Sequence, residues 1–588
     1  MTYRRRRGLK WLYRSLTILG SIVFLLGAAG GAYLWLLHTR ASIEGYRSPI
    51  RVQPRASGDP TPPLAPQVVI VLIDGLRHDA VPAMPTLAHL QRQGAGAHAI
   101  ARAPTYSQPA WTTLVTGAWP EISGAPLLNL PESQLPPIAT DHIFAAARRA
   151  GLSTALVGSS WWAKMIPANM LDAHFFAEGS DAAADQQIAD TALRFLRNFH
   201  PSLMLVFFGN LDEVAHQAGT SGYPYREAAM QIDDHLRDLV EAIDLRRSVL
   251  IVVSDHGHVA RGGHGGTDPD VTLTPFVAIG GPIIPGDYGQ IAQTDIAPTV
   301  AAIVGAPVPR LSQGSIRMEM LRADPASRAE IAIGLAQQHR EYGNLYLRSI
   351  GYGSLSDTAI GDVAVALSSY EVKNLESAYR LAQIATERIE QEVDQGRTTL
   401  IQRQRRPRLP LTLGGILAPL VILLLRGGRR GLWLLLSAVV TLALCHGISL
   451  RQGRIYSFSE LTGQQQFIEQ IAWPLLWASI AGFLLLLWRL GRDREDSALD
   501  VIQTGLGYSL LVVYLLGVQA ALIYWLNGFT LTWYIPDFRQ VFWLLMALTQ
   551  AIVAVAIGVV LPIALILAGL VFQGVAAMGR RARPMYRR

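Results

Sequence analysis

The 588-residue sequence is poor in cysteine and in charge of either sign. Its one cysteine, Cys445, lies in an apolar run, which excludes a fold held together by internal disulfides. Charged residues make up 16 % of the chain, whereas soluble domains usually carry about a quarter, and half of the residues are hydrophobic. This composition excludes both a disordered chain and an ordinary cytosolic enzyme.

The charge that is present is unevenly distributed. Residues 1–47 have a net charge of +7, residues 48–395 of −12, and residues 396–588 of +12. A nucleic-acid-binding protein would carry its basic residues on the folded body, so this class is excluded. An acidic body between basic, apolar ends is typical of a membrane protein with one large aqueous domain.

The first apolar run is an uncharged stretch of 22 residues, 16–37, which is long enough to cross a bilayer as a helix. Six basic residues precede it, so the N-terminus is predicted to stay in the cytoplasm. A cleaved signal peptide is the alternative, although its apolar region is normally shorter. The following stretch, 48–66, is rich in Pro and Arg and is predicted to be an extended linker.

Apolar runs return in the last third of the chain. They cover about 409–425, 431–450, 471–488, 501–525 and 541–573. The last run could also form two half-helices around Pro562. Six spans would leave both chain ends in the cytoplasm, with the basic loops at 426–430 and 489–494 on that side. One basic cluster, 403–408, falls on the side of the aqueous domain instead.

Short β-rich runs recur through the acidic middle, near segments with helical spacing such as 226–243. The runs are 68–73, 154–157, 203–208, 249–253 and 276–279. Strands that alternate with helices predict an α/β fold with a mostly parallel sheet flanked by helices. Ligands of such sheets bind beyond the carboxyl ends of the strands. Three of these runs are followed there by Asp74, Asp212 and Asp255.

Three imidazoles accompany the three carboxylates. The six candidate ligands are Asp74, Asp212, His216, Asp255, His256 and His264. Taken singly, each has an ordinary interpretation as a turn residue, a helix cap or an exposed pair on a helix. Glycines flank the last two histidines and leave room for a metal close to the backbone. Together the six supply ligands for a pair of divalent cations such as Zn²⁺, which can clamp the attacking and departing oxygens of a phosphoryl transfer.

A candidate nucleophile lies in the segment 103–117. Pro109 can open a helix that runs to Gly117, which places Ser107 just before the helix, where an anion is favoured. A serine at this position is most often a simple cap. The alternative is a metal-activated hydroxyl for covalent catalysis, and Thr105 is the next candidate for that role.

These motifs, in this order, resemble the alkaline phosphatase superfamily over residues 67–316. The resemblance is closest to the type I phosphodiesterase/nucleotide pyrophosphatase and phosphoethanolamine-transferase branches. It is carried by the run 69–79, the block 107–117, Asp212-x-x-x-His216, Ser254-Asp255-His256-Gly257 and Gly263-His264-Gly265-Gly266. One helix before the domain and several after it are similar to the glycosylphosphatidylinositol ethanolamine-phosphate transferases of eukaryotes.

The resemblance implies a role for each site residue. One metal would be held by Asp74, Asp255 and His256, and the other by Asp212, His216 and His264. Ser107 matches the nucleophile position and would touch the metal site. Asn129 lies one residue from the position of an oxyanion-binding Asn. Trp161 and Trp162 could line a substrate pocket, with core packing as the alternative. The two ions would be Zn²⁺, or else Mn²⁺ or Mg²⁺.

The resemblance therefore implies a membrane-bound, two-metal phosphodiesterase or phosphotransferase that works through a phosphoserine. Its substrates would be small-molecule, lipid-linked or glycan-linked phosphoesters outside the cytoplasm, and we expect a bacterial inner membrane with a periplasmic catalytic domain. The alternatives are a phosphomonoesterase, a sulfatase-like hydrolase and an inactive, metal-stabilised membrane scaffold. A sulfatase is disfavoured because Trp111 replaces the arginine of the Ser-x-Pro-x-Arg modification pattern.

The expected organisation of the chain has seven segments. They are a cytoplasmic basic tail (1–15), a transmembrane helix (16–37), a linker (38–66), an alkaline-phosphatase-like catalytic domain (67–316), a helical membrane-proximal region (317–408), C-terminal transmembrane helices (409–578) and a second cytoplasmic basic tail (579–588).

Overall fold

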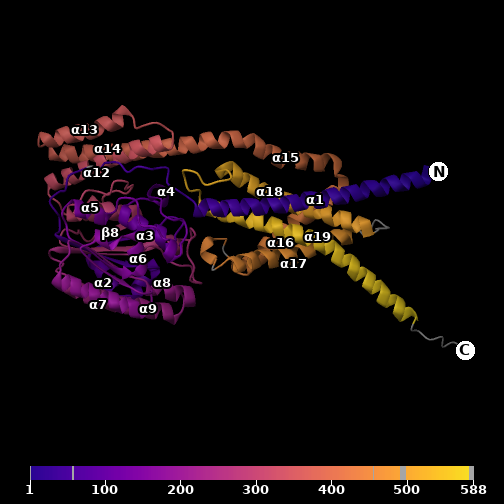
Figure 1. Ribbon diagram of the computed structural model, residues 1–588, viewed down its shortest axis with the longest axis horizontal. Coiled ribbons are helices and arrows are strands. Elements are labelled where there is room, and N and C mark those ends of the chain that lie inside the picture. Colours follow the sequence, from indigo (N-terminus) through magenta and orange to yellow (C-terminus); the bar gives the residue numbers. More distant parts are fainter. Residues whose placement is uncertain (1, 56–57, 455, 462, 491–497, 582–588) are drawn as a thin grey trace.

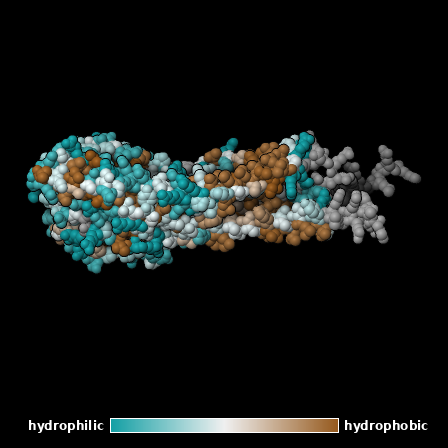
Figure 2. Space-filling model, turned by 90° about the horizontal axis from the view of Figure 1, so that it is seen from above, coloured by the Kyte–Doolittle hydropathy of each residue, from teal (hydrophilic) through white to brown (hydrophobic). Residues whose placement is uncertain are grey.

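The computed structural model describes residues 2–581 except 56–57, 455, 462 and 491–497. The molecule is elongated, with an α/β domain at one end and a group of long helices at the other (Figure 1). Hydrophobic side chains cover much of the helical half, and hydrophilic ones dominate the α/β half (Figure 2). Arg492, Arg494 and most of the predicted basic tail lie outside the described residues.

One eight-stranded sheet forms the centre of the α/β domain. Its spatial order is β4 (Ala173–Ala177), β3 (Thr154–Ser159), β5 (Leu203–Phe208), β1 (Gln67–Ile73), β6 (Ser248–Val253), β7 (Leu273–Gly280), β2 (Ala95–Ile100) and β8 (Gly286–Ala292). Only β7 runs antiparallel to its neighbours among these strands. The predicted mostly parallel sheet is confirmed, and β1, β3, β5, β6 and β7 contain the five predicted runs.

Helices cover both faces of the sheet. One face is covered by α3 (Ser107–Thr116), α5 (Ile143–Arg149), α6 (Ser160–Met165) and α11 (Ile296–Val304). The other is covered by α2 (Pro85–Gln93), α7 (Ala182–Asn198), α8 (Asn210–Ala218) and α9 (Tyr223–Ala242). Alternate residues of β1 enter the two cores, so the strand is apolar throughout, as expected for a sheet buried on both faces. Two single-turn helices, α4 (Pro120–Ser123) and α10 (Pro269–Thr272), lie in the connections.

Three helices lie along the outer side of the α/β domain and connect it to the membrane helices (Figure 1). They are α12 (Pro325–Ser349), α13 (Asp357–Glu371) and α14 (Leu375–Arg405). A 3-10 turn, Arg406–Arg408, joins α14 directly to α15 (Leu409–Arg426). The basic cluster 403–408 therefore lies where the bundle meets the aqueous domain.

Six helices of the described chain are long and apolar enough to cross a membrane. They are α1 (Thr2–Glu44), α15 with the α14 segment before it, α16 (Gly428–Arg451), α17 (Gln464–Leu490), α18 (Ala498–Asn527) and α19 (Phe538–Arg581). The prediction of one N-terminal and five C-terminal spans is confirmed, and the chain is an integral membrane protein. Because α19 is a single helix that contains Pro562, the alternative of two half-helices is wrong.

The start of α1 and the end of α19 both lie at the end of the bundle away from the α/β domain (Figure 1). An even number of spans requires both chain ends to share one side of the membrane. The aqueous domain lies on the opposite side from the basic N-terminal residues, as the distribution of positive charge predicts.

Candidate active site

The six predicted ligand side chains and Ser107 converge at one edge of the sheet. Asp74 follows β1, Asp255 and His256 follow β6, and Asp212 lies in the first turn of α8, which follows β5. These three strands are adjacent and parallel, so their carboxyl ends meet at the same edge. His264 reaches the same place from a glycine-rich loop between β6 and β7. The fold thus brings together residues that are up to 190 positions apart, most of them buried.

Ser107 is the first residue of α3 rather than the residue before it. Its Oγ lies 3.2 Å from Nε2 of His256 and 3.4 Å from the side-chain amide of Asn129. Helix α3 ends at Gly117, whose φ of 69° is left-handed, as helix C-termini favour. The serine hydroxyl therefore lies at the positive end of a buried helix, where a developing negative charge is stabilised.

Thr105, the other candidate nucleophile, is fully buried and its hydroxyl is already used. It donates to the carbonyl of Gly266 (2.9 Å) and accepts from the amide of Gly265 (3.0 Å). A hydroxyl held in this way cannot approach a substrate. The geometry favours Ser107 as the nucleophile and gives Thr105 a structural role.

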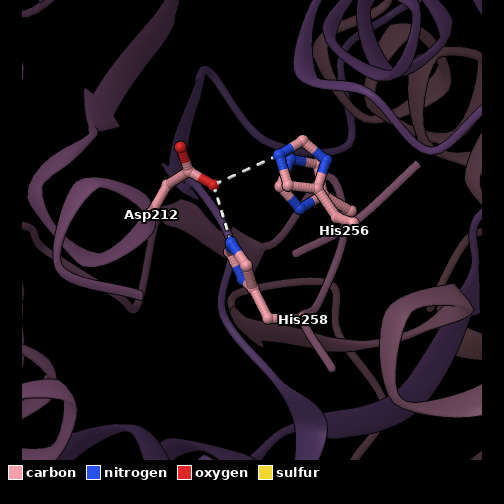
Figure 3. Close-up of side chains that lie close together, drawn as sticks. Asp212, His256 and His258 are labelled. Atoms are coloured by element: carbon pink, nitrogen blue, oxygen red, sulfur yellow. Dashed lines mark ion pairs between the residues drawn. The ribbon is translucent and has the colours of Figure 1, made fainter. Parts of the chain in front are cut away.

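Two overlapping groups of side chains could each hold a metal ion. One contains Asp74, Asp255 and His256, as expected, and the other contains Asp212, His256, His258 and His264; within each group the ligand atoms lie within 4.8 Å of one another. Figure 3 shows the Asp212 carboxylate facing His256 and His258. His216 is near the second group, with Nε2 3.4 Å from Asp212 Oδ2 and 3.1 Å from His264 Nε2, and is the most exposed of the set.

The hydrogen bonds of three histidines show that this cluster suits a cation. The Nδ1 atoms of His256, His258 and His264 each face a backbone carbonyl oxygen at 2.8–3.1 Å. Carbonyls only accept, so each neutral ring carries its proton on Nδ1 and presents an unprotonated Nε2 to the cluster. The carboxylates are equally available, because the buried atoms Asp74 Oδ1, Asp212 Oδ1 and Asp255 Oδ2 have no hydrogen-bond partner in the described chain.

His258 is the site residue that the sequence reasoning missed. Its ring is fully buried, with Nε2 2.9 Å from Asp212 Oδ1, and its Cε1 lies where a side chain at Gly75 would begin. Gly75 therefore has to be glycine, as its φ of 69° also indicates. The signal was present in Asp255-His256-Gly257-His258, since a spacing of two can direct both histidines to one side of an extended segment.

We expect His258→Ala to weaken zinc binding by about 10-fold or more, since losing even a residue that orients a metal ligand usually costs about 10- to 100-fold. His174→Ala is the matched control, because His174 is an exposed residue of β4. Zinc affinity is measured by competition with a chelating dye. Equal affinities of the two variants would show that His258 only fills space.

Burial sets the protonation of the cluster. It raises the pKa of Asp255 to about 6 and that of Asp74 well above its usual value, and in both cases a neighbouring carboxylate adds to the effect. Burial lowers the pKa of His256 to about 3 and that of His264 well below its usual value. His256 and His264 are therefore neutral at physiological pH, as metal ligation requires.

Zinc affinity is expected to fall steeply as the pH drops below about 6, because Asp74 and Asp255 must lose their protons to bind a cation. In the metal-free protein the two kinds of group have opposite effects on stability, because the lowered pKa of His256 removes stability as the pH falls from 6.5 towards about 3. An acid with a raised pKa binds its proton more tightly in the folded state, so its contribution to stability grows as the pH falls from about 6 towards 3.8. Calorimetric zinc titrations at about pH 5 and about pH 7.5 test the expected loss of affinity. Equal affinity at the two pH values would contradict the assignment.

The four glycines around His264 are each required by a different neighbour. A Cβ at Gly262 would lie 1.7 Å from the carbonyl oxygen of Ala215 in α8, and one at Gly265 would lie 2.5 Å from the Tyr106 ring. Both residues have left-handed φ angles, 88° and 109°. Gly263 and Gly266 are crowded by the loop between α16 and α17. The glycine-rich motif thus reflects close packing around the histidine from three sides.

The remaining candidates, Asn129 and the two tryptophans, differ in their placement. Asn129 lies beside Ser107, where its Oδ1 accepts from the amide of Gln108 (3.1 Å) and its NH₂ faces the serine hydroxyl. Trp162 is fully buried and stacks on Trp111 with ring centroids 5.4 Å apart. Trp161 is partly buried against the same core. The structure favours core packing for the tryptophans and a place in the site for Asn129.

The family model that matches this chain does so within the α/β domain. The model of the family described as type I phosphodiesterase / nucleotide pyrophosphatase matches residues 68–125 and 138–262. GPI ethanolamine phosphate transferase 2, catalytic subunit, of Homo sapiens is 25 % identical over 339 residues, which cover 53 % of this chain and 34 % of the relative. GPI ethanolamine phosphate transferase 2 of Schizosaccharomyces pombe is 25 % identical over 350 residues, which cover 53 % and 43 %.

Solved structures that are similar to this chain include human ectonucleotide pyrophosphatase / phosphodiesterase 5, with a TM-score of 0.38, 16 % identity and coverage of 44 % of this chain and 100 % of that one. Another is BT1596, a 2-O GAG sulfatase, with a TM-score of 0.35, 15 % identity and coverage of 44 % and 74 %. The family match and the curated relatives confirm the resemblance drawn from the motifs. The chain spans about a third to two fifths of the length of the two relatives described.

Proposed function

We propose that this chain is a membrane-bound phosphotransferase that moves a phosphoethanolamine group from a phospholipid to a hydroxyl acceptor, outside the cytoplasm. The observation that carries the proposal is the position of Ser107, whose Oγ lies beside His256 and Asn129 at the edge of the Asp–His cluster. The names of the curated relatives support phosphoethanolamine as the transferred group. The family match to phosphodiesterases supports the reaction class.

The reaction proceeds in two displacements on phosphorus. In the first, Ser107 Oγ loses its proton and forms a bond to phosphorus, the bond to the lipid oxygen breaks, and the leaving diacylglycerol oxygen takes up a proton in exchange. In the second, the acceptor hydroxyl attacks the phosphoserine, releases its proton and restores Ser107. The Asn129 amide, 3.4 Å from Ser107 Oγ, is placed to donate to a phosphoryl oxygen during both steps.

Two divalent cations fit the donor set. Asp74, Asp255 and His256 would hold one of them, and Asp212, His216 and His264, with His258 close by, would hold the other. When bound, the cations lower the pKa of the serine hydroxyl and neutralise charge on the phosphoryl oxygens. Zinc suits the mixture of imidazoles and carboxylates best.

The membrane helices support a lipid-borne substrate. They lie next to the α/β domain, so a headgroup at the membrane surface is held at high local concentration near the site. A bacterial inner membrane with a periplasmic catalytic domain remains our proposal for the location. The arginine of the sulfatase pattern is replaced by Trp111, which packs against Trp162 and Phe207, so a modified nucleophile has no support.

A labelled phospholipid distinguishes transfer from hydrolysis. Membranes that contain the full chain are incubated with phosphatidylethanolamine labelled in the ethanolamine, and membranes with Ser107→Ala serve as the control. We expect the label on a lipid or glycan acceptor in the first sample alone. Label that is released only as free phosphoethanolamine would make the protein a hydrolase and end the transferase proposal.

A further inference from the structure

The loop between α16 and α17 contacts the α/β domain at the segment that carries His264. The amide of Gly266 donates to Ser459 Oγ (3.0 Å), and the hydroxyl of Ser457 donates to the carboxylate of Asp268. The guanidinium of Arg261 lies 3.5 Å from the carboxylate of Glu460. A loop of the membrane domain thus contacts the glycine-rich segment, residues 261–268, at both of its ends. We call residues 456–461 the membrane loop.

The contact is buried and leaves no room for larger side chains. Ser457, Ser459 and Glu460 of the membrane loop are all buried. A Cβ at Gly263 would lie 2.0 Å from the carbonyl oxygen of Ser459, and one at Gly266 would lie 2.0 Å from Ser457 Oγ. Backbone therefore packs directly against backbone, which a loose surface contact does not require.

On its other side the glycine-rich segment is hydrogen-bonded to the segment that carries Ser107, the proposed nucleophile. His264 Nδ1 lies 2.8 Å from the carbonyl of Thr105, and the Thr105 hydroxyl bonds to Gly265 and Gly266. Thr105 is two residues before Ser107. The loop that presents His264 is thus clamped between the nucleophile segment and the membrane loop.

The membrane loop is itself fixed to the helical bundle. Phe458 packs against Phe538 and Phe542 of α19, with ring centroids 5.5 and 5.4 Å apart. The hydroxyl of Tyr456 lies 2.7 Å from Nδ1 of His446 in α16. The position of the clamp is therefore set by helices within the membrane.

We infer that Ser457 and Ser459 are positioning residues that hold His264 in place, so the C-terminal helices complete the active site as well as anchor it. The catalytic consequence rests on the proposed function, whereas the effect on the metal-binding cluster does not. Residues that orient a metal ligand usually change metal affinity by about 10- to 100-fold when they are lost. The double variant Ser457→Ala/Ser459→Ala removes both hydroxyls and leaves every proposed ligand intact.

The matched control is Ser42→Ala. Ser42 Oγ accepts a hydrogen bond from the amide of Leu531 at 2.8 Å, so this substitution also removes a serine hydrogen bond where the bundle meets the aqueous domain. Ser42 is far from the glycine-rich segment in sequence, and among the described residues it has no contact with that segment. Full-length proteins in detergent are compared for zinc affinity, for hydrogen exchange of the peptide 261–268, and for turnover of bis(p-nitrophenyl) phosphate.

We expect the double variant to bind zinc about tenfold or more weakly than the wild type, with faster exchange in 261–268. Its kcat on the soluble diester should fall in parallel with little change in KM, and added zinc should restore part of it. Ser42→Ala should stay close to the wild type in all three measurements. Melting temperatures identify a variant that has lost its fold, in which case Ser459→Ala alone is measured in its place.

The inference would be overturned if the serine variants had the same zinc affinity as Ser42→Ala and the same rate of hydrogen exchange in 261–268. A wild-type protein that turns over no phosphodiester, but whose serine variants still lose zinc affinity, would refute the proposed function and leave the positioning role supported. The two failures are thus told apart by the metal measurement.

Discussion

Replacing Ser107 by alanine is expected to lower the rate of phosphoryl transfer by about a thousandfold or more, since the variant has no atom that can form the bond to phosphorus. Ser107→Thr keeps a hydroxyl at the start of α3 and should retain part of the activity. The measurement is the turnover of a chromogenic phosphodiester by the full-length protein, together with trapping of a phosphorylated residue by acid quench.

Ser356→Ala is the control for this variant. Ser356 caps α13 by accepting from the amide of Ala359, so its loss should cost about 1 kcal/mol of stability and leave turnover unchanged. Substantial activity of Ser107→Ala, or a phosphorylated residue other than Ser107, would exclude the serine as nucleophile. Thr105 would not be the next candidate for the nucleophile, because its hydroxyl is hydrogen-bonded to the glycine-rich segment.

Metal removal is expected to have the second large effect. A chelator such as 1,10-phenanthroline should abolish turnover, and added Zn²⁺ should restore it, because three buried carboxylate oxygens have no hydrogen-bond partner in the described chain and lie within ligand distance of histidine nitrogens. Asp212→Asn should reduce turnover by about a hundredfold or more, since it removes the charge nearest to His258 and His264.

Asp233→Asn is the matched control for the carboxylate. Asp233 is also buried, but it accepts from the amides of Thr86 and Leu87 at the start of α2 and faces no histidine of the cluster. Turnover that persists after chelation, in protein shown by elemental analysis to contain no metal, would end the two-metal proposal. Restoration by Mg²⁺ or Mn²⁺ and not by Zn²⁺ would correct the identity of the ions.

Several elements could not be predicted from their own residues. β2 is rich in alanine and glycine, and β8 contains two glycines and mostly polar or small residues, so neither has the β-branched composition of the central strands. Both are held by pairing with neighbours, which a sequence pattern does not report. His258 was missed for a similar reason, since only the approach of Asp212 and Gly75 distinguishes it from a buried core residue.

The sequence by itself determined the apolar spans, the strands buried on both faces, and the residues that follow those strands, because hydrophobic length and strand polarity are local properties of the chain. Only the tertiary structure decided which of these residues meet. It placed the Ser107 hydroxyl beside His256 and Asn129, tied up the Thr105 hydroxyl in hydrogen bonds, added His258, and placed Ser457 and Ser459 against the His264 loop. Contacts between segments that are far apart in the sequence depend on how helices and strands pack, and no local pattern records them.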